Sequence, residues 1–470
     1  MRFHMLASFR KKYIGSRDFY MMMFKLVIPM ILQNLLMNLV NLIDNIMVGR
    51  IGTEQMSAVA IVNQFHFVFM LSLFGATSGG SIYGVQFYGS GDIKGQRDTV
   101  RFRLYVNFLI TALFVAVFLL FGPELIGSYL NSEGEIGDPI LCASYAREYM
   151  QIMILGLLPM AFSTAYASVL REVGNTAVPM YASGSAVIAN LILDYALIFG
   201  KFGLPALGVK GAAIATVISK LIEMLIVVIW THKRTDINPC IKGLYRSLRV
   251  PIPLLKDLAW VTFPLMVNEF LWSGGIAMVN QCYSIRGMEA VAATNICWLV
   301  GNLFNVLCLQ VGYCISILVG QKLGAGKLQE AKDINNKLFF LSEVLCIAVM
   351  FMLIPAGRFI PMIYNTQQEI RDLASRLIVI SALALPLQGF SHCAYFTIRS
   401  GGRTWITFAF DSLYSWTVNV PLAFVLAHFT TWPLETIYAV VVFSEIIKDV
   451  IGYLMVRSDM WMRNIVSDYQ

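Results

Sequence analysis

The sequence predicts an all-α integral membrane protein of about twelve transmembrane helices, arranged as two pseudo-symmetric six-helix bundles. Hydrophobic residues make up 57% of the 470-residue chain and charged residues only 13%, whereas a soluble domain carries about a quarter charged residues. Stretches with few or no charges recur at the length of about 17–25 residues that spans a bilayer core. Several short motifs of the first half also return in the second half, two of them at the same offset.

The apolar stretches give the individual crossings. At about 20 residues plus a short loop each, they leave no room for a large soluble domain. Met1–Asp18 is basic and polar, and the apolar segment after it is too long for a cleavable signal, so we expect that segment to stay as a helix. The expected crossings are residues 20–48, 55–88, 100–122, 147–170, 175–200, 209–232, 257–284, 288–320, 336–358, 368–399, 403–427 and 432–456.

The lysines and arginines predict the orientation. They gather in the N-terminal segment and in the loops around residues 94–103, 233–249 and 322–337, while the longest loop of the opposite set, 123–146, is acidic. Because an excess of lysine and arginine marks cytoplasmic loops, we expect both termini to be cytoplasmic in a multi-pass protein of the plasma (inner) membrane. This placement explains the net charge of +7, so the charge does not indicate nucleic-acid binding.

The repeated motifs predict the domain organisation. Gln86, Gly89 and Gly91 match Gln321, Gly324 and Gly326, and Pro29 matches Pro264. The segment after the fourth crossing repeats after the tenth, where Arg171, Gly174 and Thr176 match Arg399, Gly402 and Thr404. We expect an N-terminal six-helix lobe at 1–232, a cytoplasmic linker at 233–256 and a C-terminal six-helix lobe at 257–470. Duplicated bundles of this kind place substrate near the midplane between them.

Three polar residues of the first half are expected at membrane depth. Asp44 stands late in the first crossing, and Asn190 and Asp194 stand in the fifth, in ANLILDYALIFG. A charge at the bilayer centre costs about 2.5–3.5 kcal/mol, so each carboxylate is a candidate functional group. The i,i+4 spacing places Asn190 and Asp194 on one helix face. Carboxylate and amide oxygens suit Na⁺ or a shared proton; the alternative is that Asp44 only caps its helix at the outer interface.

Two further sets of charges lie in the sixth and twelfth crossings. Lys220 and Glu223 stand in SKLIEML, and Glu445 and Lys448 stand in SEIIKDV. Aligning the two serines makes the pairs equivalent with their signs exchanged. At i,i+3 each pair can neutralise itself, which lowers the cost of insertion, so a structural ion pair and a role in transport both stay open.

The remaining polar groups exclude several classes of protein. Glu269 and Asp411 have no local cation in the sequence, which makes them candidate sites of the second half. The eight cysteines and five histidines are scattered without ligand spacing, and no phosphate loop or serine nucleophile motif is present. We therefore expect no cofactor, no metal beyond a possible Na⁺ and no enzymatic activity. A membrane-embedded enzyme is the alternative from another class.

The order and spacing of these motifs resemble the MATE (multidrug and toxic compound extrusion) transporters of the MOP superfamily across nearly the whole chain. The resemblance is carried by Pro29 with NLIDNIMVGRIGTEQMSAVA, by LREVGNT, by NLILDYALIFG, by GVKGAAIATVIS and by VGQKLGAGK. No single motif is decisive, but their order is specific.

The resemblance implies a set of site residues. Asp44, Asn190 and Asp194 match the N-lobe cation site of the DinF-like branch, with Thr216 and Tyr149 as further members, and Pro29 is implied as a kink in the first helix. Glu269 matches a coupling glutamate of the NorM-like branch. That branch also uses an aspartate in the tenth crossing, and residues 377–398 contain no acid, so a purely NorM-like coupling scheme is not expected.

The resemblance further implies an outward-open, V-shaped cavity between two lobes and alternating access. The expected function is secondary active export of drugs and other small cationic or amphipathic organic molecules, driven by Na⁺ or H⁺ antiport, in a monomer within the lipid bilayer. A lipid-linked oligosaccharide flippase of the same superfamily is the nearest alternative. Such proteins use cationic grooves, whereas the intramembrane charges here are balanced or acidic.

Overall fold

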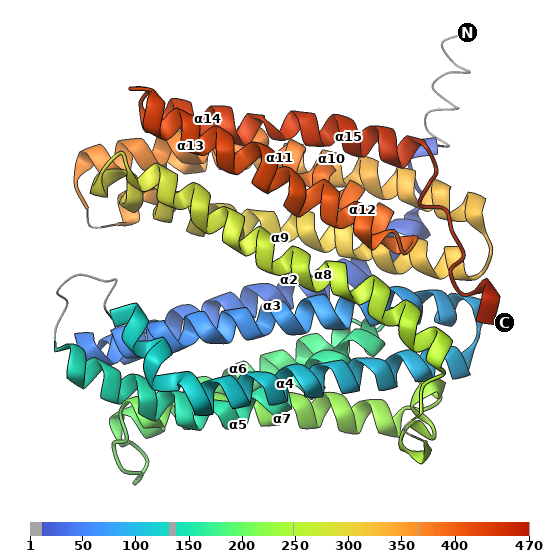
Figure 1. Cartoon of the computed structure of the whole chain (residues 1–470), viewed down its shortest axis with the longest axis horizontal. Coiled ribbons are helices and arrows are strands. Elements are labelled where there is room, and N and C mark those ends of the chain that lie inside the picture. Colours follow the sequence, from blue (N-terminus) through green and yellow to red (C-terminus); the bar gives the residue numbers. More distant parts are fainter. Residues whose placement is uncertain (1–11, 131–137, 248, 365, 470) are drawn as a thin grey trace. The chain divides into compact units, whose positions relative to one another are not determined.

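The computed structural model describes residues 12–130, 138–247, 249–364 and 366–469, and this part of the chain is built from helices joined by short loops (Figure 1). Ten helices are continuous: α2 (Arg17–Gly49), α3 (Thr53–Ser90), α4 (Ile93–Leu130), α5 (Pro139–Glu172), α6 (Ala177–Phe199), α7 (Val209–Lys233), α8 (Ile252–Ser284), α9 (Met288–Gly324), α10 (Leu328–Phe359) and α11 (Gln368–Ser400).

Two more helical segments are interrupted. The first runs from α12 (Thr404–Phe408) through π-helical turns at Ala409–Leu413 and Ser415–Asn419 into α13 (Val420–Phe429). The second runs from α14 (Leu434–Phe443) into α15 (Glu445–Arg457), with a break at Ser444. The twelve segments coincide with the twelve expected crossings, which confirms the all-α integral membrane class.

Nine helices of the described residues are by themselves long and apolar enough to cross a membrane. The segments outside this group are α8 and the two interrupted ones. In α8, Asn268 and Glu269 stand in the middle of the apolar stretch. Several helices are also longer than expected: α4 begins at Ile93 and α5 at Pro139, because helices continue through the interface beyond the hydrocarbon core. The acidic residues Glu133 and Glu135, used for the orientation, lie outside the described residues.

The chain forms two compact units. The N-terminal unit comprises Ile28–Gly84 and Ile93–Ala259; the C-terminal unit comprises the chain up to Val27, Val85–Asp92 and the residues from Trp260 onward. The first parts of α2 and α8 and the last turns of α3 therefore belong to a different unit from the rest of their helices. The lobe boundaries expected from sequence, with a linker at 233–256, stay a prediction.

In the N-terminal unit α5 packs against α4 and α7, and α7 packs against α6; Figure 1 shows α4, α5 and α7 as neighbouring ribbons. One buried cluster joins α4, α5, α6 and α7 to the loop after α7, with members such as Val100, Leu170 and Ile241. Arginines fasten that loop, since Arg97 Nε donates to Cys240 O at 3.0 Å and Arg101 Nε donates to Leu244 O at 2.9 Å.

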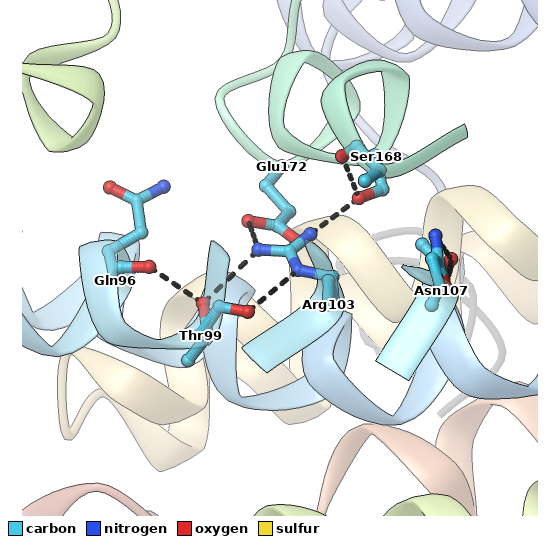
Figure 2. A network of polar contacts seen from close by, with 8 residues as sticks. Gln96, Thr99, Arg103, Asn107, Ser168 and Glu172 are labelled. Atoms are coloured by element: carbon cyan, nitrogen blue, oxygen red, sulfur yellow. Dashed lines mark hydrogen bonds and ion pairs between the residues drawn. The ribbon is translucent and has the colours of Figure 1, made fainter. Parts of the chain in front are cut away.

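A fully buried ion pair ties α4 to α5 (Figure 2). The Arg103 and Glu172 side chains are 0% and 1% exposed, and the guanidinium also donates to Thr99 and Ser168. A Cβ added at Gly80 or Gly84 of α3 would come within 2.6 Å of Arg103 or 2.5 Å of Glu172. Glycines on α3 thus provide the space for the pair. Because breaking such a pair leaves a buried charge uncompensated, at a cost of about 3–5 kcal/mol, this network makes the scaffold rigid.

In the C-terminal unit α9, α10 and α11 pack against one another, and α11 also packs against α14 and α15. The last turns of α3 are part of this unit. The buried Gln86 donates to Ser400 O at 2.9 Å and to Arg463 O at 3.1 Å, and its Oε1 accepts from the Ile465 N–H at 2.9 Å.

The repeated glycines have two structural roles. Gly91 follows α3 directly and Gly326 follows α9 after Ala325, with positive φ angles of 80° and 72°, as glycine adopts most easily at the end of a helix. Gly89 and Gly324 stand where these two helices cross. A Cβ at Gly89 would lie 1.9 Å from Gln321 O, and a Cβ at Gly324 would lie 1.9 Å from Gln86 O. The duplicated motif therefore packs on its own copy, backbone against backbone.

We predict that Gly324→Ala destabilises the protein by about 3 kcal/mol or more, the upper end for an overpacked site, because a main-chain oxygen cannot turn aside as a side chain can. The matched control is Gly301→Ala on the same helix, where the added Cβ would meet nothing within 4 Å and alanine is the better helix former. The measurement is the melting temperature of the detergent-purified variants. Equal melting temperatures for the two variants would contradict the close crossing.

Candidate functional site

The N-terminal unit brings the carboxyls of Asp44 and Asp194 together. Asp44 comes from α2 and Asp194 from α6, and each lies within hydrogen-bonding reach of the other. Asp194 is 1% exposed and Asn190, one turn earlier on the same face of α6, is 3% exposed. These residues lie far apart in the sequence, and the packing of the bundle makes them neighbours.

The same carboxyls have oxygen atoms without a donor. Within the described part of the chain, Asp44 Oδ1, both carboxyl oxygens of Asp194 and both amide atoms of Asn190 are buried without a hydrogen-bond partner. Because buried polar atoms are normally hydrogen-bonded, this cluster is suited to a group from outside the chain. A proton shared by the two carboxyls, or a small cation between them, would satisfy these oxygens.

Tyr149 and Thr216 complete the cluster. Tyr149 on α5 is buried, interacts electrostatically with Asp44 and Asp194, and lies beside Thr216 on α7. The Thr216 hydroxyl also donates to Ala212 O at 3.0 Å. All five residues expected in the N-lobe site therefore lie together, on α2, α5, α6 and α7.

The donor set limits which ions fit. The described residues contain no group of three or more histidine, cysteine, aspartate or glutamate side chains placed to hold a metal ion. Two carboxyls with an amide, a phenol and a hydroxyl provide hard oxygen ligands of low total charge. Such a set suits a proton or Na⁺ better than a tightly held divalent metal.

The expected Lys220–Glu223 pair is present beside this cluster. Lys220 Nζ lies 3.1 Å from Glu223 Oε2. Glu223 Oε1 also accepts from Ser183 Oγ at 2.6 Å, and Ser183 Oγ accepts from Gln33 Nε2 at 2.8 Å. Ser183 and Gln33 were not singled out from the sequence. Their signal there was a polar residue inside an apolar helix, which many residues share.

Pro29 lies inside α2, which continues as a helix on both sides of it. Proline removes a backbone hydrogen bond and favours a bend. The residue is in the N-terminal unit, and that unit begins at Ile28. The kink at Pro29 stays a prediction, now placed next to a boundary between compact units.

The C-terminal unit corrects the expected pairing of Lys448. Its ammonium lies 2.8 Å from Asp411 Oδ1, and no ion pair within the described residues joins it directly to Glu445. Asp411 stands in the π-helical turn Ala409–Leu413 and also accepts from Asn268 Nδ2 at 3.2 Å. Glu445 interacts with Lys448 only electrostatically. Glu445 and Lys448 both stand in α15, so their i,i+3 spacing is kept, but the ammonium bonds to the acid that the π-helical turn of the neighbouring segment presents. The i,i+3 argument therefore gave the wrong partner, and Asp411 does have a cationic partner.

Other acids of the C-terminal unit surround this pair. Glu269 on α8 hydrogen-bonds to Asn268 and interacts electrostatically with Arg399 and Asp411. Asp449, which sequence reasoning missed, accepts from Ser391 Oγ at 2.6 Å. Asp449 follows the noted Lys448 directly, but a carboxylate near the end of a membrane helix often lies in the interface, so the sequence gave it no separate signal.

Comparisons with known proteins agree on one family. The MatE family model matches residues 29–196 and 264–425. A probable multidrug resistance protein NorM of Thermotoga maritima is 26% identical over 447 residues, which cover 94% of this chain and 93% of that protein. A probable multidrug resistance protein YoeA of Bacillus subtilis is 26% identical over 405 residues, 86% of each chain.

Solved structures show the same fold. A crystal structure of a MATE protein in the bent conformation has a TM-score of 0.84 at 20% identity, covering 94% of this chain and 95% of that one. An outward-facing structure of a multidrug resistance MATE family transporter of the MOP superfamily has a TM-score of 0.82 at 20% identity, covering 93% and 95%. At these identities the likeness concerns the fold alone.

We predict that Asp411→Asn and Lys448→Met each destabilise the protein, by up to about 3 kcal/mol, because each leaves one charge of a part-buried pair uncompensated. The double variant should recover much of this loss, since it removes both charges. The measurement is the melting temperature of the two single variants and the double variant. The control is the double variant of Glu445→Gln with Lys448→Met. If stability were recovered in this double variant and not in the one that contains Asp411→Asn, Glu445 would be the partner of Lys448, as the sequence predicted.

Proposed function

The chain belongs to the MATE family, and we propose that it exports small cationic or amphipathic organic molecules by exchange for Na⁺ or H⁺. Members of the family are membrane transporters and not enzymes, so the chain is a transporter and the alternative of a membrane-embedded enzyme is excluded. The relatives named as multidrug resistance proteins support drugs as cargo. The observation that carries the proposal is the buried Asp44–Asp194 carboxyl pair with its unpartnered oxygens.

The carboxyl pair provides the coupling. Two charged carboxylates in contact repel each other strongly in a medium of low dielectric constant. A cation arriving from outside removes that repulsion and lets α2 and α6 pack closely. In our proposal this packing change releases the cargo on the outside, and loss of the cation to the cytoplasm restores affinity for the next molecule.

The membrane potential is a sufficient source of energy. A unit charge moving down about 150 mV provides roughly 3.5 kcal/mol. This free energy supports a cargo gradient of about a few hundredfold, because each 1.4 kcal/mol corresponds to a factor of ten. Alternating access then requires two lobes that move against each other. We propose residues 1–232 and 257–470 for these lobes, with 233–256 as the connection.

We further propose a plasma (inner) membrane location, a monomer, and cytoplasmic termini and linker. The loop charges support this orientation. The linker has an exposed reporter position at Ser247, and the loop between α6 and α7 has one at Lys201. Native thiols do not interfere, since all eight cysteines are buried. Burial also raises the pKa of Cys240 in the linker to about 12, which removes its reactive thiolate.

We predict that Lys201→Cys reacts with an impermeant maleimide in intact cells and that Ser247→Cys reacts only after permeabilisation. Intact and permeabilised cells are treated with the maleimide, each variant is then purified, and its labelling is measured, with the protein without added cysteines as the blank. Labelling of Ser247→Cys from outside, with Lys201→Cys protected, would reverse the topology.

We predict that Asp44→Asn and Asp194→Asn keep normal expression and lose at least about tenfold of gradient-driven efflux. Each change keeps the size of the side chain and removes the charge that attracts the coupling cation. The measurement is ethidium efflux from proteoliposomes under an imposed Na⁺ or pH gradient. Asp18→Asn, an exposed acid on the same helix α2, is the control. Wild-type rates in both site variants would move the coupling to the C-terminal unit. Lipid movement without ethidium efflux would favour the flippase.

A further inference from the structure

A chain of hydrogen-bonded side chains connects four helices of the N-terminal unit next to the carboxyl pair. It runs from Lys220 and Glu223 on α7 to Ser183 on α6 and Gln33 on α2. Arg171 on α5 is the other end of this series of bonds, since its Nη2 donates to Gln33 Oε1 at 3.0 Å. Glu223 and Ser183 are buried, at 9% and 2% exposure. This hydrogen-bonded network links α2, which carries Asp44, with α6, which carries Asp194.

Lys220 stands at one end of this hydrogen-bonded network. Its ammonium is bonded to Glu223 and also interacts electrostatically with Asp44. His66 on α3, another titratable group, interacts electrostatically with the same ammonium. Lys220 is thus one positive charge that interacts with two acids, Glu223 and Asp44. A lysine head group on a flexible four-carbon stem can move between two such partners.

Glu223 keeps favourable partners when the ammonium moves away. Ser183 Oγ still donates to its Oε1, and the Arg171 guanidinium still interacts with it electrostatically. A buried carboxylate needs such partners for its remaining lone pairs even when it is ion-paired, and these partners stay in place when the ammonium leaves. Without them, moving Lys220 would leave a buried charge uncompensated, at a cost of several kcal/mol. With them, the two positions of the ammonium come closer in free energy.

We propose that Lys220 is a positioning residue for the coupling cation: its ammonium competes with the cation for the Asp44 carboxylate of the pair, and Glu223 sets the strength of this competition. When the carboxylates are charged, the ammonium turns toward Asp44. When a cation occupies them, the ammonium returns to Glu223. The hydrogen bond from Ser183 to Glu223, and the bond from Gln33 to Ser183, carry the change to α6 and α2. This inference rests on the proposed antiport at Asp44 and Asp194.

The two charges must then act in opposite directions. Lys220→Met removes the competitor, so the cation concentration for half-maximal ethidium efflux falls by about tenfold. Glu223→Gln releases the ammonium to the Asp44 carboxylate, so the same concentration rises by about tenfold. Lys220→Arg keeps the charge and should stay near the wild-type value. The measurement uses proteoliposomes, with external Na⁺ varied at fixed pH and external pH varied at fixed Na⁺.

The matched controls are Lys210→Met on the same helix α7 and Glu148→Gln on α5. These residues form a more exposed pair at 3.2 Å, and neither should shift the half-maximal concentration, since exposed pairs are screened by water. If Lys220→Met is not recovered as a folded monodisperse protein, Lys220→Gln replaces it. Shifts of both variants in the same direction, or no shift in either, would overturn the proposal.

The design separates this inference from the proposed function. If Asp44→Asn abolishes coupled efflux while the Lys220 and Glu223 variants keep the wild-type dependence on the cation, the antiport stands and the inference is wrong. If the unmodified protein moves no ethidium under either gradient, the proposed function is wrong. If Asp44→Asn abolishes coupled efflux, and Lys220→Met and Glu223→Gln shift the half-maximal cation concentration in opposite directions, both the proposed function and this inference are supported.

Discussion

Contact between two carboxyls inside a bundle of membrane helices is the interaction on which the functional part of this structure depends. Asp44 and Asp194 meet between α2 and α6, where a charge costs about 2.5–3.5 kcal/mol on insertion scales and like charges repel far more than in water. In the antiport that we propose, a cation from outside neutralises the pair and offsets this cost. Cation binding then contributes to the stability of the unit and drives a change in helix packing.

The buried ion pair of Arg103 and Glu172 differs from the carboxyl pair, because its charges are compensated within the protein. Arg103 and Glu172 satisfy each other and are bonded to Thr99 and Ser168, so this buried charge needs nothing from outside. The contrast separates two kinds of buried charge in one unit: a saturated pair that fixes α4 on α5, and an unsaturated pair that accepts a partner. Lys220 lies between these extremes, because it has one bonded acid and a second acid within electrostatic reach.

The amount that sequence could predict depended on the range of each interaction. Hydropathy located the helices, and the i,i+4 spacing of Asn190 and Asp194 placed both on one face of α6, because these signals are local. The partner of Lys448 was missed, since it depends on how Asp411 is presented by a π-helical turn in another segment. Ser183 and Gln33 were missed for a related reason: their bond joins residues 150 positions apart and depends on the rotation of two helices. Family resemblance supplied Tyr149 and Thr216, which neither periodicity nor charge singled out.

The contacts of Gln86 set an order on biosynthesis. This buried amide, near the end of the second long helix, is bonded to Ser400, Arg463 and Ile465. A ribosome makes Gln86 long before Arg463 and Ile465, which follow the last long helix, α15. The amide of Gln86 therefore gains its full set of partners only when the segment after α15 has been made. Removal of that segment would take two hydrogen bonds from the end of α3, although every membrane helix would still be present.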